Sequence, residues 1–205
     1  MKGLFLDFDG TLADSLPAMR RAYRAFLGEF GARATDAEFE ALNGPPLPVI
    51  VQRLKAAHGL GPEEAALAEV YREKIAAAGA ETRPAAGARE VLEAAASRGW
   101  TAAVVSSASR AAIDGFLSAH GLDALVALVV GGEDAAPGKP DPGPYRLALQ
   151  RTGCAAEASL AVEDSFDGAS AALGAGLPTW MVGQGPGPDG VRGRLAGLEA
   201  VVNLL

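Results

Sequence analysis

LFLDFDGTLADS, residues 4–15, ends an apolar run in two carboxylates. Residues 3–8 predict a buried strand, which ends in Asp7 and Asp9 with Phe8 between them. Because side chains alternate along a strand, the two aspartates share one face and Phe8 lies on the other. Two like charges this close resist joint ionisation unless a cation or a shared proton lies between them. The stretch therefore predicts a site at the end of the first strand, rather than a solvated strand end that caps the next helix.

Downstream of residue 83, helical patterns alternate with short apolar strands. The expected strands cover residues 101–106, 125–130, 159–163 and 178–182, and the expected helices cover residues 85–98, 109–120, 143–152 and 167–175. This alternation is typical of a parallel sheet covered by helices on both faces.

The stretch between the first two strands predicts helices and no strand. The first helix should follow Ser15, a candidate cap, with Pro17 in its first turn. A second helix begins near Leu47 and ends at Gly59, and a third opens at Pro62. We therefore expect an α/β fold with a Rossmann-like, doubly wound parallel sheet formed by residues 1–13 and 83–205. A small all-helical cap domain, residues 14–82, is inserted after the first strand.

Polar side chains follow four of the expected strands. Asp7 and Asp9 end the first, Ser106 and Ser107 the second, and Glu163 with Asp164 the fourth; Lys139 lies in the loop after the third. Because ligands bind at the carboxyl ends of the strands in open parallel sheets, these residues should converge on one site.

This convergence favours phosphoryl transfer. Carboxylate oxygens are suited to magnesium, and a lysine and a hydroxyl complete a phosphate site. Asp7 would attack phosphorus to form an aspartyl phosphate, which is nucleophilic catalysis. Asp9 would protonate the leaving alkoxide and then activate the hydrolytic water.

Four motifs, in order, resemble those of the haloacid dehalogenase superfamily. They are DFDGT (7–11), VVSSAS (104–109), GKPDP (138–142) and VEDSFDGASAALGAG (162–176). The resemblance covers the whole chain, with the helical insertion placed as in the branch similar to phosphoglycolate phosphatases and β-phosphoglucomutases. It implies a hydrolase acting on phosphoric monoesters.

By motif position, the resemblance implies Asp7 as the nucleophile and Asp9 as the acid and base. It also implies that Ser107 and the amide of Ala108 bind the phosphoryl group and that Lys139 clamps its charge.

The same resemblance implies that Asp7, Asp9, Asp164 and Glu163 hold Mg²⁺. Asp167 is an alternative to Glu163 as the partner of Asp164 at the metal. The other interpretation of Asp167 is that it caps helix 167–175 in an exposed position.

Ser106 is the alternative to Ser107 in the second motif.

Asp9 counts against dehalogenation, because dehalogenases of this superfamily lack the second aspartate. A phosphomutase is the alternative activity, but it carries a cap arginine where this chain has prolines, in NGPPLPVIVQRL (43–54). Arg20 and Arg53 are further candidates to meet the substrate. A non-enzymatic phospho-acceptor module is a third alternative, although such modules lack the second aspartate and the cap.

Composition limits the partners. The net charge is −7 and the pI is near 4.9, so we expect no nucleic-acid surface. A single cysteine, Cys154, predicts a reducing compartment, and the absence of a signal peptide or long apolar run predicts a cytoplasmic protein that does not bind membranes. His58 and His120 precede helix-ending glycines and should not be catalytic.

We expect a monomer or weak dimer. Its substrate should be a small phosphorylated metabolite, either a two- or three-carbon acid phosphate or a sugar phosphate, because the stiff GPPLP turn leaves little room for a large leaving group.

Overall fold

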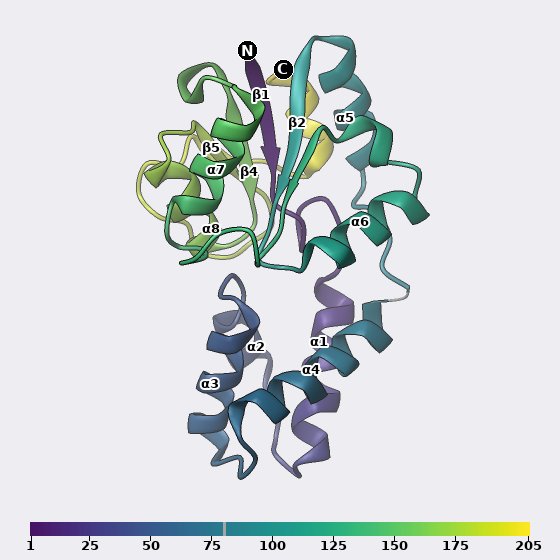
Figure 1. Cartoon of the computed structure of the whole chain (residues 1–205), viewed down its shortest axis with the longest axis vertical. Coiled ribbons are helices and arrows are strands. Elements are labelled where there is room, and N and C mark those ends of the chain that lie inside the picture. Colours follow the sequence, from purple (N-terminus) through teal and green to yellow (C-terminus); the bar gives the residue numbers. More distant parts are fainter. Residues whose placement is uncertain (80) are drawn as a thin grey trace.

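The computed structural model of the chain describes residues 1–79 and 81–205 (Figure 1). Within this part, six strands form one sheet in the order β3-β2-β1-β4-β5-β6, and every neighbouring pair is parallel. The strands are β1 (Lys2–Leu6), β2 (Trp100–Val105), β3 (Leu128–Val130), β4 (Leu160–Glu163), β5 (Thr179–Met181) and β6 (Gly193–Arg194). This is the strand order of the Rossmann fold.

Helices cover both faces of the sheet. The two flanking pairs are α5 (Ala88–Ser97) with α6 (Arg110–Ala119), and α7 (Gly143–Thr152) with α8 (Phe166–Gly174). Figure 1 shows these pairs on opposite sides of the strands. Three short 3-10 helices, Asp123–Leu125, Ala156–Ala158 and Leu198–Asn203, complete this part of the described chain.

Alternation along β1 decides which side each residue faces. Leu4 and Leu6 pack into the apolar core beneath α5 and α6, whereas Phe5 packs into the core beneath α7 and α8. Asp7 continues the Phe5 side of the chain, and Phe8 returns to the first core, where its ring meets Phe116 edge-on at 5.0 Å. The position of Asp7 therefore follows from the same two-residue period that buries the strand.

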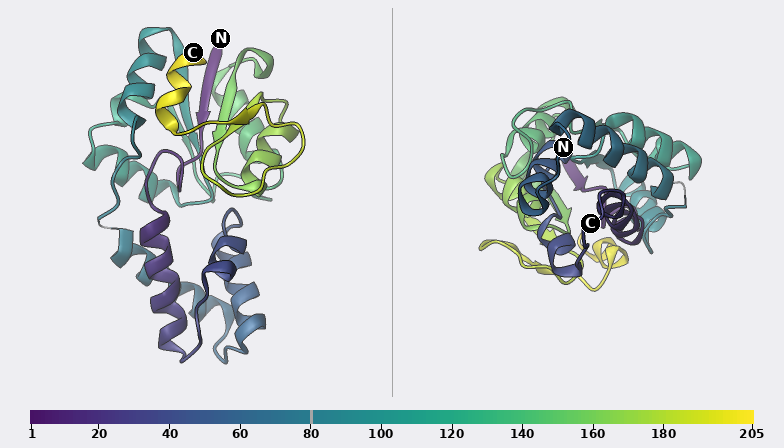
Figure 2. Two further views of the ribbon diagram at one scale, coloured as in Figure 1. Left: turned by 180° about the vertical axis from the view of Figure 1, so that it is seen from behind. Right: turned by 90° about the horizontal axis from the view of Figure 1, so that it is seen from below.

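Four helices lie between β1 and β2 in the sequence. They are α1 (Leu16–Glu29), α2 (Asp36–Ala41), α3 (Leu47–His58) and α4 (Glu64–Gly79). They enclose an apolar core of their own, in which Phe26 of α1 stacks on Tyr71 of α4 with ring centroids 4.7 Å apart. Figures 1 and 2 show this bundle below the carboxyl ends of the strands, with both chain termini at the opposite end of the molecule.

The predicted fold class is confirmed, and the structure corrects several details. Helix α2 and strand β6 were not expected, because six and two residues are too short to show a periodic pattern. Ser15 stands at the N-cap of α1 but makes no side-chain capping bond. Helix α8 is capped by Ser165, whose Oγ accepts from the Gly168 amide, so the cap role considered for Asp167 was wrong. Residues 183–190 form an irregular loop, and most of them are exposed. Within the described residues, no helix is both long and apolar enough to cross a bilayer.

The stacked pair in the helical bundle gives a stability prediction. Phe26→Ala should lower the free energy of unfolding by about 3–5 kcal/mol, because it removes a fully buried ring and leaves a cavity. Urea denaturation measures the loss. The exposed Arg53→Ala on α3 is the control and should stay within about 0.5 kcal/mol of the wild type. Equal stability of the two variants would contradict the packing of Phe26 in the bundle.

Candidate active site

The polar strand ends meet where the order of the sheet reverses, between β1 and β4. The amide of Asp7, directly after β1, donates to the carbonyl of Val162 in β4 at 3.0 Å. Glu163 ends β4, and Asp164 follows it. Such a reversal opens a crevice at the carboxyl edge of a doubly wound sheet, so the predicted convergence is present.

Lys139 is the centre of this group. Its Nζ donates to Asp7 Oδ1 at 2.7 Å, to Glu163 Oε1 at 2.5 Å and to the carbonyl of Val105 at 2.9 Å. Only 3% of its side chain is exposed. Burial alone would lower the pKa of Lys139, but the charges of Asp7 and Glu163 outweigh burial and hold the pKa above its usual value. The lysine is therefore a fixed positive charge.

Glu163 is fully enclosed and closely held. Tyr145 of α7 donates its hydroxyl to Glu163 Oε1 at 2.5 Å, beside the Lys139 bond. Burial and the nearby charge of Asp7 raise the pKa of Glu163. Gly168 makes room for this carboxylate, since a Cβ there would lie 2.0 Å from Glu163 Oε2. Tyr145 was not predicted from the sequence. Its hydroxyl lies on the face of helix 143–152 that turns toward the sheet, and that position is the pattern that could have identified it.

Three of the four predicted metal residues come together. Oxygen atoms of Asp7, Glu163 and Asp164 lie within 4.8 Å of one another, in the part of the chain that the structure describes. Burial, followed by the charge of Asp7, raises the pKa of Asp164. Lys139 pairs with Asp7 and Glu163, whereas Asp164 has no ion-pair partner among the described residues. A cluster of buried carboxylate oxygens with excess negative charge fits a hard divalent cation such as Mg²⁺. Asp9 and Asp167 are not members of this cluster.

Asp9 occupies a separate position at the tight turn after β1. Its Oδ1 is enclosed and has no hydrogen-bond partner among the described residues. Burial raises the pKa of Asp9 to about 6. The turn itself requires glycine: Gly10 has a φ of +81°, and a Cβ there would lie 2.3 Å from Asp164 Oδ2. An enclosed carboxyl whose pKa lies closer to neutral pH than usual is suited to both giving and taking a proton.

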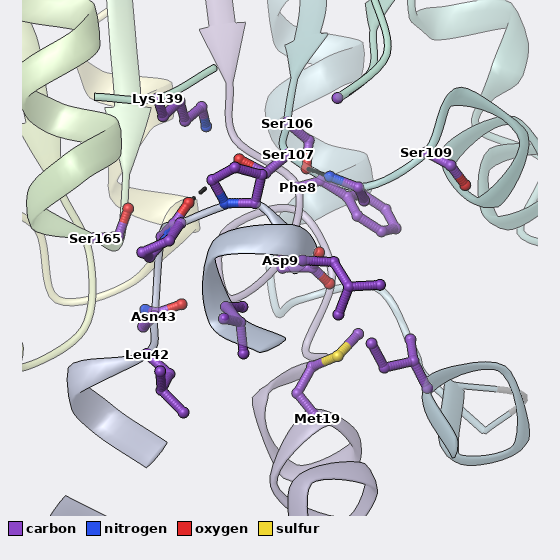
Figure 3. Close-up of a pocket in the computed structure, with 18 of the residues that line it drawn as sticks. Phe8, Asp9, Met19, Leu42, Asn43, Ser106, Ser107, Ser109, Lys139 and Ser165 are labelled. Atoms are coloured by element: carbon purple, nitrogen blue, oxygen red, sulfur yellow. Dashed lines mark hydrogen bonds between the residues drawn. The ribbon is translucent and has the colours of Figure 1, made fainter. Parts of the chain in front are cut away.

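The second motif places both serines at the cavity (Figure 3). Ser106 Oγ accepts from the amide of Ala108 at 3.0 Å, so that amide is already engaged. Ser107 donates its hydroxyl to the carbonyl of Gly44 at 3.2 Å. The choice between Ser106 and Ser107 as the phosphoryl ligand therefore stays open, with Ser107 on the side that faces the helical bundle.

The turn between α2 and α3 reaches the strand ends. Asn43 donates from Nδ2 to Asp164 Oδ2 at 2.8 Å, next to the contact of Gly44 with Ser107. Figure 3 shows Asn43 between Leu42 and Ser165, below Lys139. The sequence predicted that this turn faces the site, but it did not predict the role of Asn43. A single polar residue in a loop shows no periodicity that would tell which way its side chain faces.

A cavity of about 570 Å³ lies between the strand ends and the helical bundle. Residues 44–48 of the GPPLP turn line this cavity. Arg20 and Arg53 do not line it; Arg20 instead pairs with Asp36 at 2.9 Å. His58 contacts Glu38 at 2.9 Å, and His120 contacts the carbonyl of Thr82 at 3.2 Å, so neither lies among the catalytic candidates.

The contact of Gly168 with Glu163 predicts that alanine at position 168 lowers the stability of the protein, although helix propensity alone predicts a gain. Alanine normally stabilises a helix interior, but Gly168→Ala should destabilise the protein by about 1–3 kcal/mol, because the new methyl group overlaps the Glu163 carboxylate. Gly115→Ala on α6 is the matched control, since a Cβ there meets nothing within 4 Å; it should stabilise by about 0.4–1 kcal/mol. Thermal unfolding of both variants measures this difference, and stabilisation by Gly168→Ala would disprove the packing of Glu163.

Known proteins resemble the chain along most of its length. Residues 4–182 match the family model described as haloacid dehalogenase-like hydrolase. A phosphoglycolate phosphatase of Rhodospirillum rubrum is 32% identical over 195 residues, with 90% of this chain and 80% of the relative covered. The plasmid-encoded protein CbbY of Cupriavidus necator is 32% identical, with 87% and 77% covered.

Solved structures share the fold. CbbY from Rhodobacter sphaeroides, in complex with phosphate, superposes with a TM-score of 0.85 at 23% identity and covers 98% of this chain and 96% of its own. The family match spans far more than half of the sequence and includes all four motifs. The chain is a hydrolase of the haloacid dehalogenase-like family.

Proposed function

We propose that this hydrolase is a magnesium-dependent phosphatase that cleaves a small phosphate monoester through an aspartyl phosphate on Asp7. The observation that carries the proposal is the buried Lys139, which holds the Asp7 carboxylate through Oδ1 beside two further carboxylates. Relatives named phosphoglycolate phosphatase support a small phosphorylated substrate.

In the first step, an oxygen of Asp7 attacks phosphorus and the bond from phosphorus to the leaving alcohol breaks. Asp9 gives its proton to the departing alkoxide; the raised pKa of Asp9, about 6, is consistent with a proton donor. In the second step, Asp9 takes a proton from water, the water oxygen attacks phosphorus, and the bond between phosphorus and Asp7 breaks. Inorganic phosphate leaves, and Asp7 is again a carboxylate and Asp9 again a carboxylic acid.

The residues around Asp7 balance the charge of the phosphoryl group. Lys139 supplies a fixed positive charge, and Ser107 supplies a hydroxyl donor once it leaves the carbonyl of Gly44. Asp7 and Asp164 would hold Mg²⁺, which supplies a further positive charge for the phosphoryl oxygens. Glu163 takes part chiefly through its bond to Lys139, which fixes the lysine against Asp7.

We further propose that residues 14–82 act as a cap on a catalytic core formed by residues 1–13 and 83–205. The chain leaves and re-enters the core at adjacent points, where the amide of Asp14 donates to the carbonyl of Arg83 at 2.9 Å. Two neighbouring links of this kind permit the bundle to move as a unit. Closure would exclude water from the site, and opening would release the product.

The metal prediction tests this function directly. Hydrolysis of a phosphate ester should require Mg²⁺ and stop with a chelator, because the carboxylate cluster repels an anionic substrate without it. Mg²⁺ alone should also raise the melting temperature of the wild type, since a ligand that binds only the native state stabilises it. Asp164→Asn should weaken this shift, whereas Arg53→Ala should retain it. Turnover that survives exhaustive chelation would refute the proposal.

A further inference from the structure

The side of the cavity that faces the strand ends differs from the side that faces the helices. Asp7, Asp9, Asp164, Ser107 and Lys139 lie on the first side. The bundle contributes mainly apolar side chains, among them Met19 of α1, Phe39 of α2, Ile50 of α3 and Ile75 of α4. Figure 3 shows Met19 rising from α1 toward Asp9. The phosphoryl group would therefore contact polar and charged side chains, whereas the leaving group would contact mainly apolar ones.

Cations are scarce on the leaving-group side. Of the described residues that line the cavity, Lys139 and Arg72 are the only positively charged ones. Lys139 is already bonded to two carboxylates. Arg72 pairs with Glu69 on its own helix, and 55% of its side chain is exposed. A carboxylate or second phosphate on the substrate would find no buried cation on this side.

The size of the cavity also exceeds the need of a two-carbon acid. Its volume of about 570 Å³ lies within the range of roughly 300–1,000 Å³ that is typical of pockets enclosing drug-sized ligands. An apolar group that fills such a pocket gains free energy in proportion to the area it buries, about fourfold in affinity for each methylene. A short, charged leaving group would leave most of this apolar surface unused.

We propose that the leaving alcohol is uncharged and mainly apolar, with a branched alkyl chain or a single ring that fills the space between Met19, Ile50 and Ile75. The proposal rests on the phosphatase function proposed above and narrows its substrate class. It separates this chain from the relatives named phosphoglycolate phosphatase, and it departs from the acid and sugar phosphates expected from the sequence.

A series of esters tests the proposal on the wild-type protein. With Mg²⁺ present, kcat/KM should rise from ethyl through propyl to 3-methylbutyl phosphate, by about fourfold for each buried methylene. Values for 2-phosphoglycolate and glycerol 3-phosphate should lie below that of 3-methylbutyl phosphate. A flat or falling series, or a preference for 2-phosphoglycolate, would overturn the inference.

The matching alkylphosphonates separate this inference from the phosphatase proposal. They lack a bond that the protein could hydrolyse, so calorimetry reports binding alone. Affinity should rise along the same series even if no ester is turned over; in that case the phosphatase function would be wrong and the apolar pocket correct. Affinity that does not depend on chain length would overturn the pocket.

Substitutions at one pocket position sharpen the test. Met19→Lys should lower kcat/KM for 3-methylbutyl phosphate on the order of tenfold, the equivalent of one to two methylenes, and raise it for 2-phosphoglycolate. Met19→Leu keeps the side chain apolar and should keep the order of preference. Ala25→Lys places the same charge on the exposed face of α1 and should leave the whole profile unchanged. If Met19→Lys and Ala25→Lys give the same profile, α1 does not contact the leaving group.

Discussion

Lys139 carries a positive charge inside the protein, between the carboxylates of Asp7 and Glu163. The three groups come from the end of β1, the loop after β3 and the end of β4, so the triad ties together segments far apart in the chain. An ion pair this deeply buried adds little net stability, but removal of one partner leaves an unbalanced charge and costs about 3–5 kcal/mol. The arrangement of the side chains at the carboxyl edge therefore depends on one interaction.

The surroundings of the triad are built around it. Tyr145 satisfies Glu163 from α7, and Gly168 leaves space for the same carboxylate at the start of α8. Because Lys139 binds Asp7 through one oxygen, the orientation of the carboxylate is fixed before any substrate arrives. Such preorganisation is how enzymes stabilise charge that develops in a transition state. Asn43 links the helical bundle to the same site through Asp164.

The sequence was sufficient to predict the fold and the convergence of the candidate site residues, for a physical reason. Apolar strands that alternate with helices force a parallel sheet, and the carboxyl ends of parallel strands lie at one edge, so Asp7, Lys139 and Asp164 had to approach one another. Tyr145 and Asn43 were not predicted, because their roles depend on which way one side chain turns. The apolar lining of the cavity depends on how four helices pack over the sheet, which no local pattern in the sequence shows.

The stereochemical course at phosphorus tests the proposed role of Asp7 as nucleophile most directly. Attack by Asp7, followed by attack of water, is two in-line displacements, and each inverts the configuration. A phosphorothioate ester made chiral with an oxygen isotope, hydrolysed in water that carries a different oxygen isotope, gives chiral inorganic thiophosphate. An aspartyl intermediate predicts net retention of configuration in that product. Inversion would mean that water attacks the ester directly, and it would contradict the role of Asp7 as nucleophile.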